Sequence, residues 1–187
     1  MIFICLAGFI SGCSSPPDPS VPEGAFRRMG PCADQRDAKC LFRCLDRDSR
    51  WSVHTIYKTL TQLNEIVNKF YPEDARKTAF GTWVEEAGAP SAEEMFVVFC
   101  AKRRCLDRLA EGFGPVDEIA TIGPYRARVK TRRGKSFDFR QADGKWGLDT
   151  YHDELVAAKL HLIDRLHEAE RNAKAYKEQE LAGGGAR

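Results

Sequence analysis

The spacing of apolar residues changes along the chain, and this change constrains the fold more than any other feature. Up to about residue 112 the apolar residues recur at steps of three and four, as on one face of an α-helix. Between residues 125 and 140 they alternate with polar ones, as in strands with one buried face. Helical spacing returns at residue 152. The sequence therefore predicts an α+β fold, with helices in the N-terminal half, then a small antiparallel meander and a long C-terminal helix.

Helical segments are expected at four places before the meander. The first carries an apolar stripe over residues 34–45. The second presents one apolar face over residues 51–70 and ends before Pro72, because proline disfavours a helical conformation in the residue that precedes it. The third and fourth cover residues 72–87 and 91–109, and a capping box opens the fourth.

Two turns divide the alternating segment into antiparallel strands. Arg133-Gly134 and Asp143-Gly144 are pairs of the kind that close hairpins. Residues 116–122 are expected to add a further strand. The helix over residues 152–180 has a long apolar stripe, which suits either packing back on the sheet or pairing with another helix as a short coiled coil. We favour packing on the domain.

The first residues of the chain resemble an export signal. Residues 1–12 contain no charge and are mostly apolar, but they are too few to span a bilayer, which takes about 20 apolar residues. They lead into Ile10-Ser11-Gly12-Cys13, which resembles the lipobox of bacterial lipoproteins. The resemblance implies that the leader is removed, that Cys13 carries lipid, and that Ser14 directs the protein to the outer membrane. The missing positive charge after Met1 departs from the usual signal.

This resemblance sets the expected organisation of the chain. Residues 1–12 would be a lipoprotein signal peptide, residues 13–30 the lipidated cysteine and a proline-rich tether, residues 31–182 a single α+β domain, and residues 183–187 a flexible tail. With 43% hydrophobic and 30% charged residues, the composition is that of a globular protein. A net charge of +2 implies no general attraction to nucleic acid.

The meander carries a second resemblance. It closes with Asp143-Gly144-Lys145-Trp146, and residues 120–148 are similar to the cystatin-like and nuclear-transport-factor-like domains of small periplasmic lipoproteins. The resemblance implies a helix packed across a curved antiparallel sheet. The helices expected over residues 72–110 and the long C-terminal helix depart from that pattern. Such folds host enzymes, binding modules and immunity proteins alike, so the resemblance predicts no particular function.

The cysteines are the first candidate site. With Cys5 lost in the leader and Cys13 lipidated, five remain, which is an odd number in a compartment that permits disulfides. Cys44 lies in an apolar stripe and is expected to be the buried free thiol. Residues 100 and 105 cannot be bridged within one continuous helix, because five residues separate the Cα atoms by about 8 Å and a disulfide needs less than roughly 7 Å. The candidate disulfide cysteines are Cys32, Cys40, Cys100 and Cys105.

Metal-binding and catalytic motifs are not recognisable in the sequence. The spacing Cys-x7-Cys-x3-Cys lacks the paired short spacing of structural zinc sites, and His161 and His167 fall on different faces of a helix. The chain contains neither Gly-x-Ser-x-Gly nor His-Glu-x-x-His. We expect His54, near Trp51 on the long helix, to pack rather than to act as a general base. The prediction is no metal site, no cofactor and no catalytic residue.

The meander also concentrates positive charge. Between Pro124 and Lys145 there are eight basic residues and two acidic ones. A positive face favours an anionic partner, namely lipid head groups, a cell-wall polymer or an acidic protein. The alternative is a solvated face that protects the sheet from aggregation. Nucleic acid is disfavoured because few aromatic residues interleave the bases. Alternation places four of the basic residues on the same solvent-facing side: Arg126, Arg128, Lys130 and Arg140.

These features predict a lipid-anchored lipoprotein of the cell envelope that faces the periplasm and has a structural or binding role without catalysis. Its partners would be the membrane, through the lipid on Cys13, and an anionic envelope polymer or an acidic protein. Two alternatives stay open. One is a thiol-based or hydrolytic envelope enzyme. The other is a cytosolic interaction protein, in which residues 1–12 belong to the core.

Overall fold

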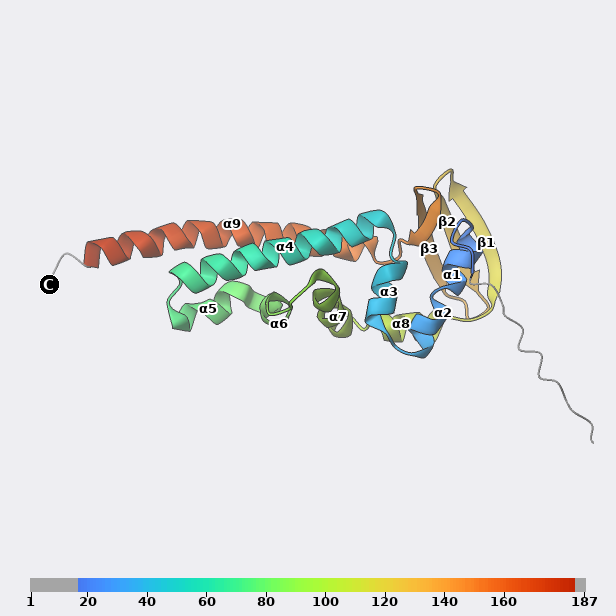
Figure 1. Ribbon diagram of the computed structural model, residues 1–187, viewed down its shortest axis with the longest axis horizontal. Coiled ribbons are helices and arrows are strands. Elements are labelled where there is room, and N and C mark those ends of the chain that lie inside the picture. The colour runs from blue at the N-terminus through green and yellow to red at the C-terminus, as the bar shows by residue number, and fades with distance from the viewer. Residues whose placement is uncertain (1–16, 184–187) are drawn as a thin grey trace, which may run out of the picture.

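The molecule is elongated, with a sheet at one end and a helical arm at the other (Figure 1). The computed structural model describes residues 17–183. Two long helices, α4 (Arg47–Phe70) and α9 (His152–Gly183), run side by side from the sheet to the far end of the arm. The α+β prediction is confirmed in its order of helices, sheet and C-terminal helix. Cys13 and the predicted export signal lie outside the described residues, as does the chain after Gly183.

Three short helices precede α4: α1 (Pro22–Arg27), α2 (Gly30–Asp34) and α3 (Ala38–Cys44). The prediction of an extended tether over residues 13–30 is therefore wrong for much of its described part. Phe26 is buried, and its ring stacks on that of Phe113 with 4.7 Å between the centroids. Pro22 stands in the first turn of α1, where proline favours a helix start. One large apolar side chain thus fixes the second half of the segment to the domain.

The long helices α4 and α9 both start at the sheet and run in the same direction (Figure 1). Asp46 caps α4, since its carboxylate accepts hydrogen bonds from the backbone amides of Asp48 and Ser49 at 2.8 and 3.2 Å. At the other end of α4, the hydroxyl of Tyr71 donates to the carbonyl of Ala169 at 3.3 Å. The C-terminal helix packs within the domain, as favoured above, but its main partner is the helix α4 and not the sheet.

Four further helices complete the arm and connect it to the sheet: α5 (Glu73–Phe80), α6 (Val84–Ala87), α7 (Ala92–Lys102) and α8 (Cys105–Gly112). They arise because two predicted helices are interrupted. Gly81, with φ 57°, ends α5 before a 3-10 turn over Gly81–Trp83. Arg104 is left-handed, with φ 53°, and separates α7 from α8. This second break lies between Cys100 and Cys105.

The sheet is an antiparallel meander of β1 (Val116–Gly123), β2 (Arg126–Thr131), β3 (Ser136–Ala142) and β4 (Lys145–Leu148) in that order. Asp143 and Gly144 both have positive φ, 51° and 74°, as a two-residue type I′ hairpin requires. Helix α1 contacts β2 and β4 and covers one face. The predicted meander and the further strand over residues 116–122 are confirmed, whereas Tyr125 is exposed in the turn before β2.

One apolar core runs from the sheet into the arm. Phe26 and Phe139 belong to it at the sheet end, and Leu162 and Ala169 of α9 belong to it in the arm. Within residues 17–183, no helix combines the length and apolar character needed to cross a membrane.

Candidate functional site

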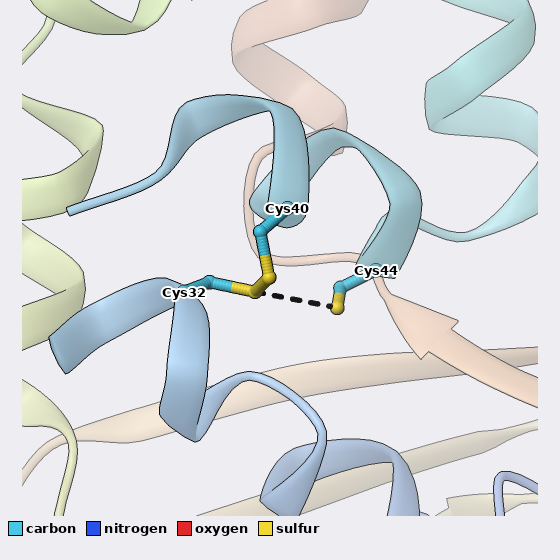
Figure 2. A group of neighbouring side chains, drawn as sticks. All are labelled: Cys32, Cys40 and Cys44. Atoms are coloured by element: carbon cyan, nitrogen blue, oxygen red, sulfur yellow. Dashed lines mark hydrogen bonds between the residues drawn. A yellow bond between two sulfur atoms is a disulfide. The ribbon is translucent and has the colours of Figure 1, made fainter. Parts of the chain in front are cut away.

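Three cysteine side chains meet where α2 packs against α3 (Figure 2). The chain reverses between these helices at Arg36, which has φ 50°. Cys40 and Cys44 lie one turn apart on the same face of α3, and Cys32 approaches from α2. Cys32 and Cys40 form a disulfide with Cα atoms 5.2 Å apart. The Sγ atom of Cys44 lies 3.7 Å from that of Cys32, and all three sulfurs are within 4.8 Å of one another.

The thiol of Cys44 is half-buried and lies near Arg28 and Arg43. Its Sγ lies 3.8 Å from the carbonyl oxygen of Arg28, to which it donates a weak hydrogen bond. Burial is the main influence on this thiol and raises its pKa, while the guanidinium groups of Arg28 and Arg43 act in the opposite direction. Cys44 is therefore mainly a protonated thiol at neutral pH.

The remaining predicted disulfide cysteines lie elsewhere. The disulfide prediction is confirmed for Cys32 and Cys40, whereas Cys100 and Cys105 are free, buried thiols at the junction of α7 and α8. A hydrogen bond between them raises the pKa of Cys100 and lowers that of Cys105. They meet only because the helix breaks at Arg104. Cys44 is free as predicted, although it is half-buried and not fully enclosed.

A basic pocket of about 360 Å³ lies beside Cys44, where the end of α1, the start of α4 and the β3–β4 hairpin converge. Its charged lining consists of five basic and two acidic residues. Among the described residues, Arg28, Arg50 and Lys145 make no ion pair. These three exposed cations give the pocket its positive potential. The charged residues that line it are Arg28, Arg43, Arg47, Arg50, Lys145, Asp46 and Asp143.

An exposed tryptophan stands next to the basic pocket. Arg47 and Arg50 line both this pocket and a shallower hollow completed by Trp51 and His54. Trp51 is 67% exposed, so its predicted place on the apolar face of the long helix is wrong. It precedes the buried Val53 by two residues, which places it about 200° away around the helix. His54 is also exposed.

The predicted anion-binding face carries its four basic residues in ion pairs. Arg126 and Arg140 are directly opposed across β2 and β3, a repulsive arrangement that Asp149 relieves at 3.0 and 3.4 Å. Acidic residues from outside the meander neutralise much of this positive charge. A charge count over the meander alone omits them. The free positive face predicted from the sequence is therefore wrong in this respect. The pairs are Arg126 and Asp149, Arg128 and Asp138, Lys130 and Asp117, and Arg140 with Asp48 and Asp149.

A polar cluster of two buried carboxylates and a half-buried histidine joins the basic pocket to the sheet. Asp46, Asp149 and His152 bring potential ligand atoms within 4.8 Å of one another. However, the guanidinium groups of Arg126 and Arg140 already approach Asp149, and they supply the positive charge that a metal ion would otherwise provide. We therefore assign this cluster to the junction between the sheet and the arm.

No motif or spacing in the sequence indicates the residues of the basic pocket. Residues 27–50 contain seven basic and four acidic residues, so a charge count over this segment would have indicated a second positive region. Because residues 13–30 were predicted to be a tether, Arg28 was not expected to be part of the domain. A charge count could not predict that Lys145 joins this region, because the β3–β4 hairpin brings it to the start of α4 only in the folded chain.

The chain was compared with known proteins at three levels. No protein-family model, no curated protein and no solved structure matches it.

Proposed function

We propose that this is a lipid-anchored protein of the cell envelope, whose domain binds the phosphate groups of anionic lipids in the basic pocket and has no catalytic role. The observation that carries the proposal is the set of cations that make no ion pair among the described residues: Arg28, Arg50 and Lys145. They converge on a hollow large enough for a phosphate group. The predicted anion-binding role thus moves from the sheet face to this pocket.

Only a few residues separate Cys13, the expected site of lipid attachment, from a segment that contacts the wall of the pocket. The backbone amide of Trp146, which lines the pocket, donates to the carbonyl of Pro19 at 2.8 Å. Cys13 precedes Pro19 by six residues, and an extended chain spans at most roughly 3.6 Å per residue, so six residues of any conformation reach at most about 22 Å from this contact. Lipid on Cys13 would hold the pocket near the membrane surface. This geometry favours lipid phosphates over a distant polymer.

The exposed indole of Trp51 supports the same partner. Tryptophan is enriched where one side of a ring meets an apolar phase and its N–H meets water, as at a membrane surface. Arg47 and Arg50 flank it and belong to the basic pocket. Each basic residue near an anionic leaflet contributes about 1 kcal/mol to binding.

Vesicle sedimentation tests the proposal with a chain that begins at Ser14 and carries no lipid. Binding to vesicles containing phosphatidylglycerol should exceed binding to pure phosphatidylcholine and should weaken with salt. Replacing both Arg50 and Lys145 by glutamine removes two cations, so the affinity should fall by about 2 kcal/mol, or about thirtyfold.

A matched control removes the same charge from the sheet. Replacing Arg128 and Lys130 by glutamine alters the net charge equally but affects residues that are already paired with Asp138 and Asp117. This variant should bind nearly as well as the parent chain. Equal losses in the two variants, or equal binding to neutral vesicles, would show that the pocket is not the site.

A further inference from the structure

The cysteine cluster contains one sulfur more than a disulfide requires. Cys40 and Cys44 occupy successive turns of α3, and both face Cys32 on α2 (Figure 2). The Sγ atoms of Cys32 and Cys44 are 3.7 Å apart, and a bond between them requires about 2.05 Å. A side-chain movement of less than 2 Å, about the difference between these values, is enough to join them. Either bond would link α2 to the same face of α3.

We infer that these three cysteines form a thiol–disulfide exchange centre. Cys44, as a thiolate, attacks the Sγ atom of Cys32. The Cys32–Cys44 bond forms as the Cys32–Cys40 bond breaks, and the electron pair of the broken bond leaves on the sulfur of Cys40. Cys40 then takes up a proton from solvent, to which Cys44 had released one. The number of disulfides is unchanged, so the step consumes neither an oxidant nor a reductant.

The exchange changes which thiol is free. In the structure the free thiol is that of Cys44, which lines the basic pocket. After exchange the free thiol is that of Cys40, on the preceding turn of α3, and the wall of the pocket has lost its thiol. Arg28 and Arg43 stabilise the attacking thiolate and offset part of the cost of its burial. The inference does not depend on what the pocket binds.

Tryptic mapping can test the exchange because each of the three cysteines falls on its own peptide. Cleavage after arginine and lysine gives residues 29–36 with Cys32, residues 40–43 with Cys40 and residues 44–47 with Cys44. The full chain is kept at mildly alkaline pH without added thiol or oxidant, sampled over minutes to hours, and quenched with N-ethylmaleimide in denaturant. The samples are then digested without reduction and analysed by mass spectrometry.

We expect two linked pairs to be present at equilibrium, 29–36 with 40–43 and 29–36 with 44–47. The alkyl group should appear on Cys44 in the first and on Cys40 in the second, with one label per molecule among the three cysteines. The Cys44→Ser variant should show the first pair alone. If the parent chain retains only the first pair, with the label confined to Cys44 at every time, the inference is wrong.

A second variant tests the new bond directly. Cys40→Ser retains Cys32 and Cys44, which should form a disulfide on air oxidation and yield the linked pair 29–36 with 44–47. Circular dichroism of the same sample reports whether its helix content equals that of the parent chain. If a folded Cys40→Ser protein leaves both thiols open to alkylation after oxidation, the proposed exchange partner is excluded.

Discussion

At the scale of single residues, Asp46 connects α4, the sheet and the basic pocket. Its carboxylate caps α4, its backbone amide donates to Leu148 at 3.0 Å, and it lines the basic pocket. It is 2% exposed, and its Oδ2 atom has no hydrogen-bond partner in the described part of the chain. Burial raises the pKa of this carboxyl, and the nearby charge of Asp149 adds to the effect.

This raised pKa predicts how stability depends on pH. The folded protein holds the proton of Asp46 more tightly than the unfolded chain, so this group's contribution to the free energy of unfolding falls as pH rises from about the ordinary value of 3.8 through the raised pKa. Asp46→Asn keeps a good capping side chain and cannot ionise. Its unfolding free energy, measured by urea denaturation across this range, should fall less with pH than that of the parent chain.

A substitution at Asp107, a carboxyl whose pKa is lowered and not raised, provides the control. A hydrogen bond from Arg104, with the charges of Arg104 and Arg36, lowers the pKa of Asp107. Asp107 therefore contributes stability that is present above its ordinary pKa and lost as pH falls through the lowered one. Asp107→Asn should remove stability mainly at the higher pH values. A parallel displacement of the whole profile in both variants would contradict the assignment to ionisation.

At the scale of secondary-structure elements, the pocket depends on the close passage of β4 over the start of α4. A Cβ atom added at Gly147 would lie 2.5 Å from the Cα of Asp46 and 2.6 Å from its backbone nitrogen. Only glycine allows the two backbones to approach this closely. Both elements contribute residues to the basic pocket, so this contact sets the distance between Lys145 and Arg50.

Substitution of two glycines, one at the contact and one away from it, tests whether this close approach matters. Gly147→Ala should lower the free energy of unfolding by about 1–3 kcal/mol, because the added methyl group has to displace backbone. Gly123→Ala at the end of β1 meets nothing within 4 Å and should change stability by less than about 0.5 kcal/mol. Urea denaturation of the two variants measures the difference. Equal effects would show that the approach at Gly147 is not needed.

The elements differ in how well the sequence predicts them. The meander is predictable because alternation and the Asp143-Gly144 turn are local signals of the right period and backbone conformation. The break between α7 and α8 cannot be predicted from the sequence, because Arg104 adopts a left-handed conformation that its residue type does not favour. The contact between Cys100 and Cys105 depends on that break, so the spacing of the two cysteines in the sequence could not predict it either.

The candidate site shows the same division between local and distant signals. Cys40 and Cys44 share a helix face that their spacing predicts, but Cys32 joins them through the reversal at Arg36. The solvent-facing side of the meander was also predictable, since its basic residues alternate with buried ones. Their neutralisation was not, because acids such as Asp48 and Asp149 come from other elements.

At the scale of the whole molecule, the sheet lies at one end together with α1, α2 and α3, and the arm of α4 and α9 extends away from them (Figure 1). The residues of the basic pocket and of the cysteine cluster belong to α1, α2, α3, the start of α4 and the β3–β4 hairpin, so both sites lie at the sheet end. If Cys13 carries lipid, this end faces the membrane and the arm projects from it. The proposed anchor and the proposed binding site thus act at the same surface.

The anchor predicts a specific labelling pattern. Cells that express the chain and are fed labelled palmitate should incorporate the label, and Cys13→Ser should abolish it, because that thiol is the expected attachment site. Cys44→Ser, which also removes a free thiol, should be labelled like the parent chain. Label that persists in Cys13→Ser, or that never appears, would exclude the anchor.

The location of the binding surface is tested most directly by hydrogen–deuterium exchange of the unlipidated chain, with and without vesicles containing phosphatidylglycerol. We expect slower amide exchange over residues 43–51 and 142–147, which line the basic pocket and the hollow beside Trp51, and little change over residues 126–130 of the sheet. Protection that appears on residues 126–130, or that is absent from both pocket segments while the chain is bound, would contradict this expectation.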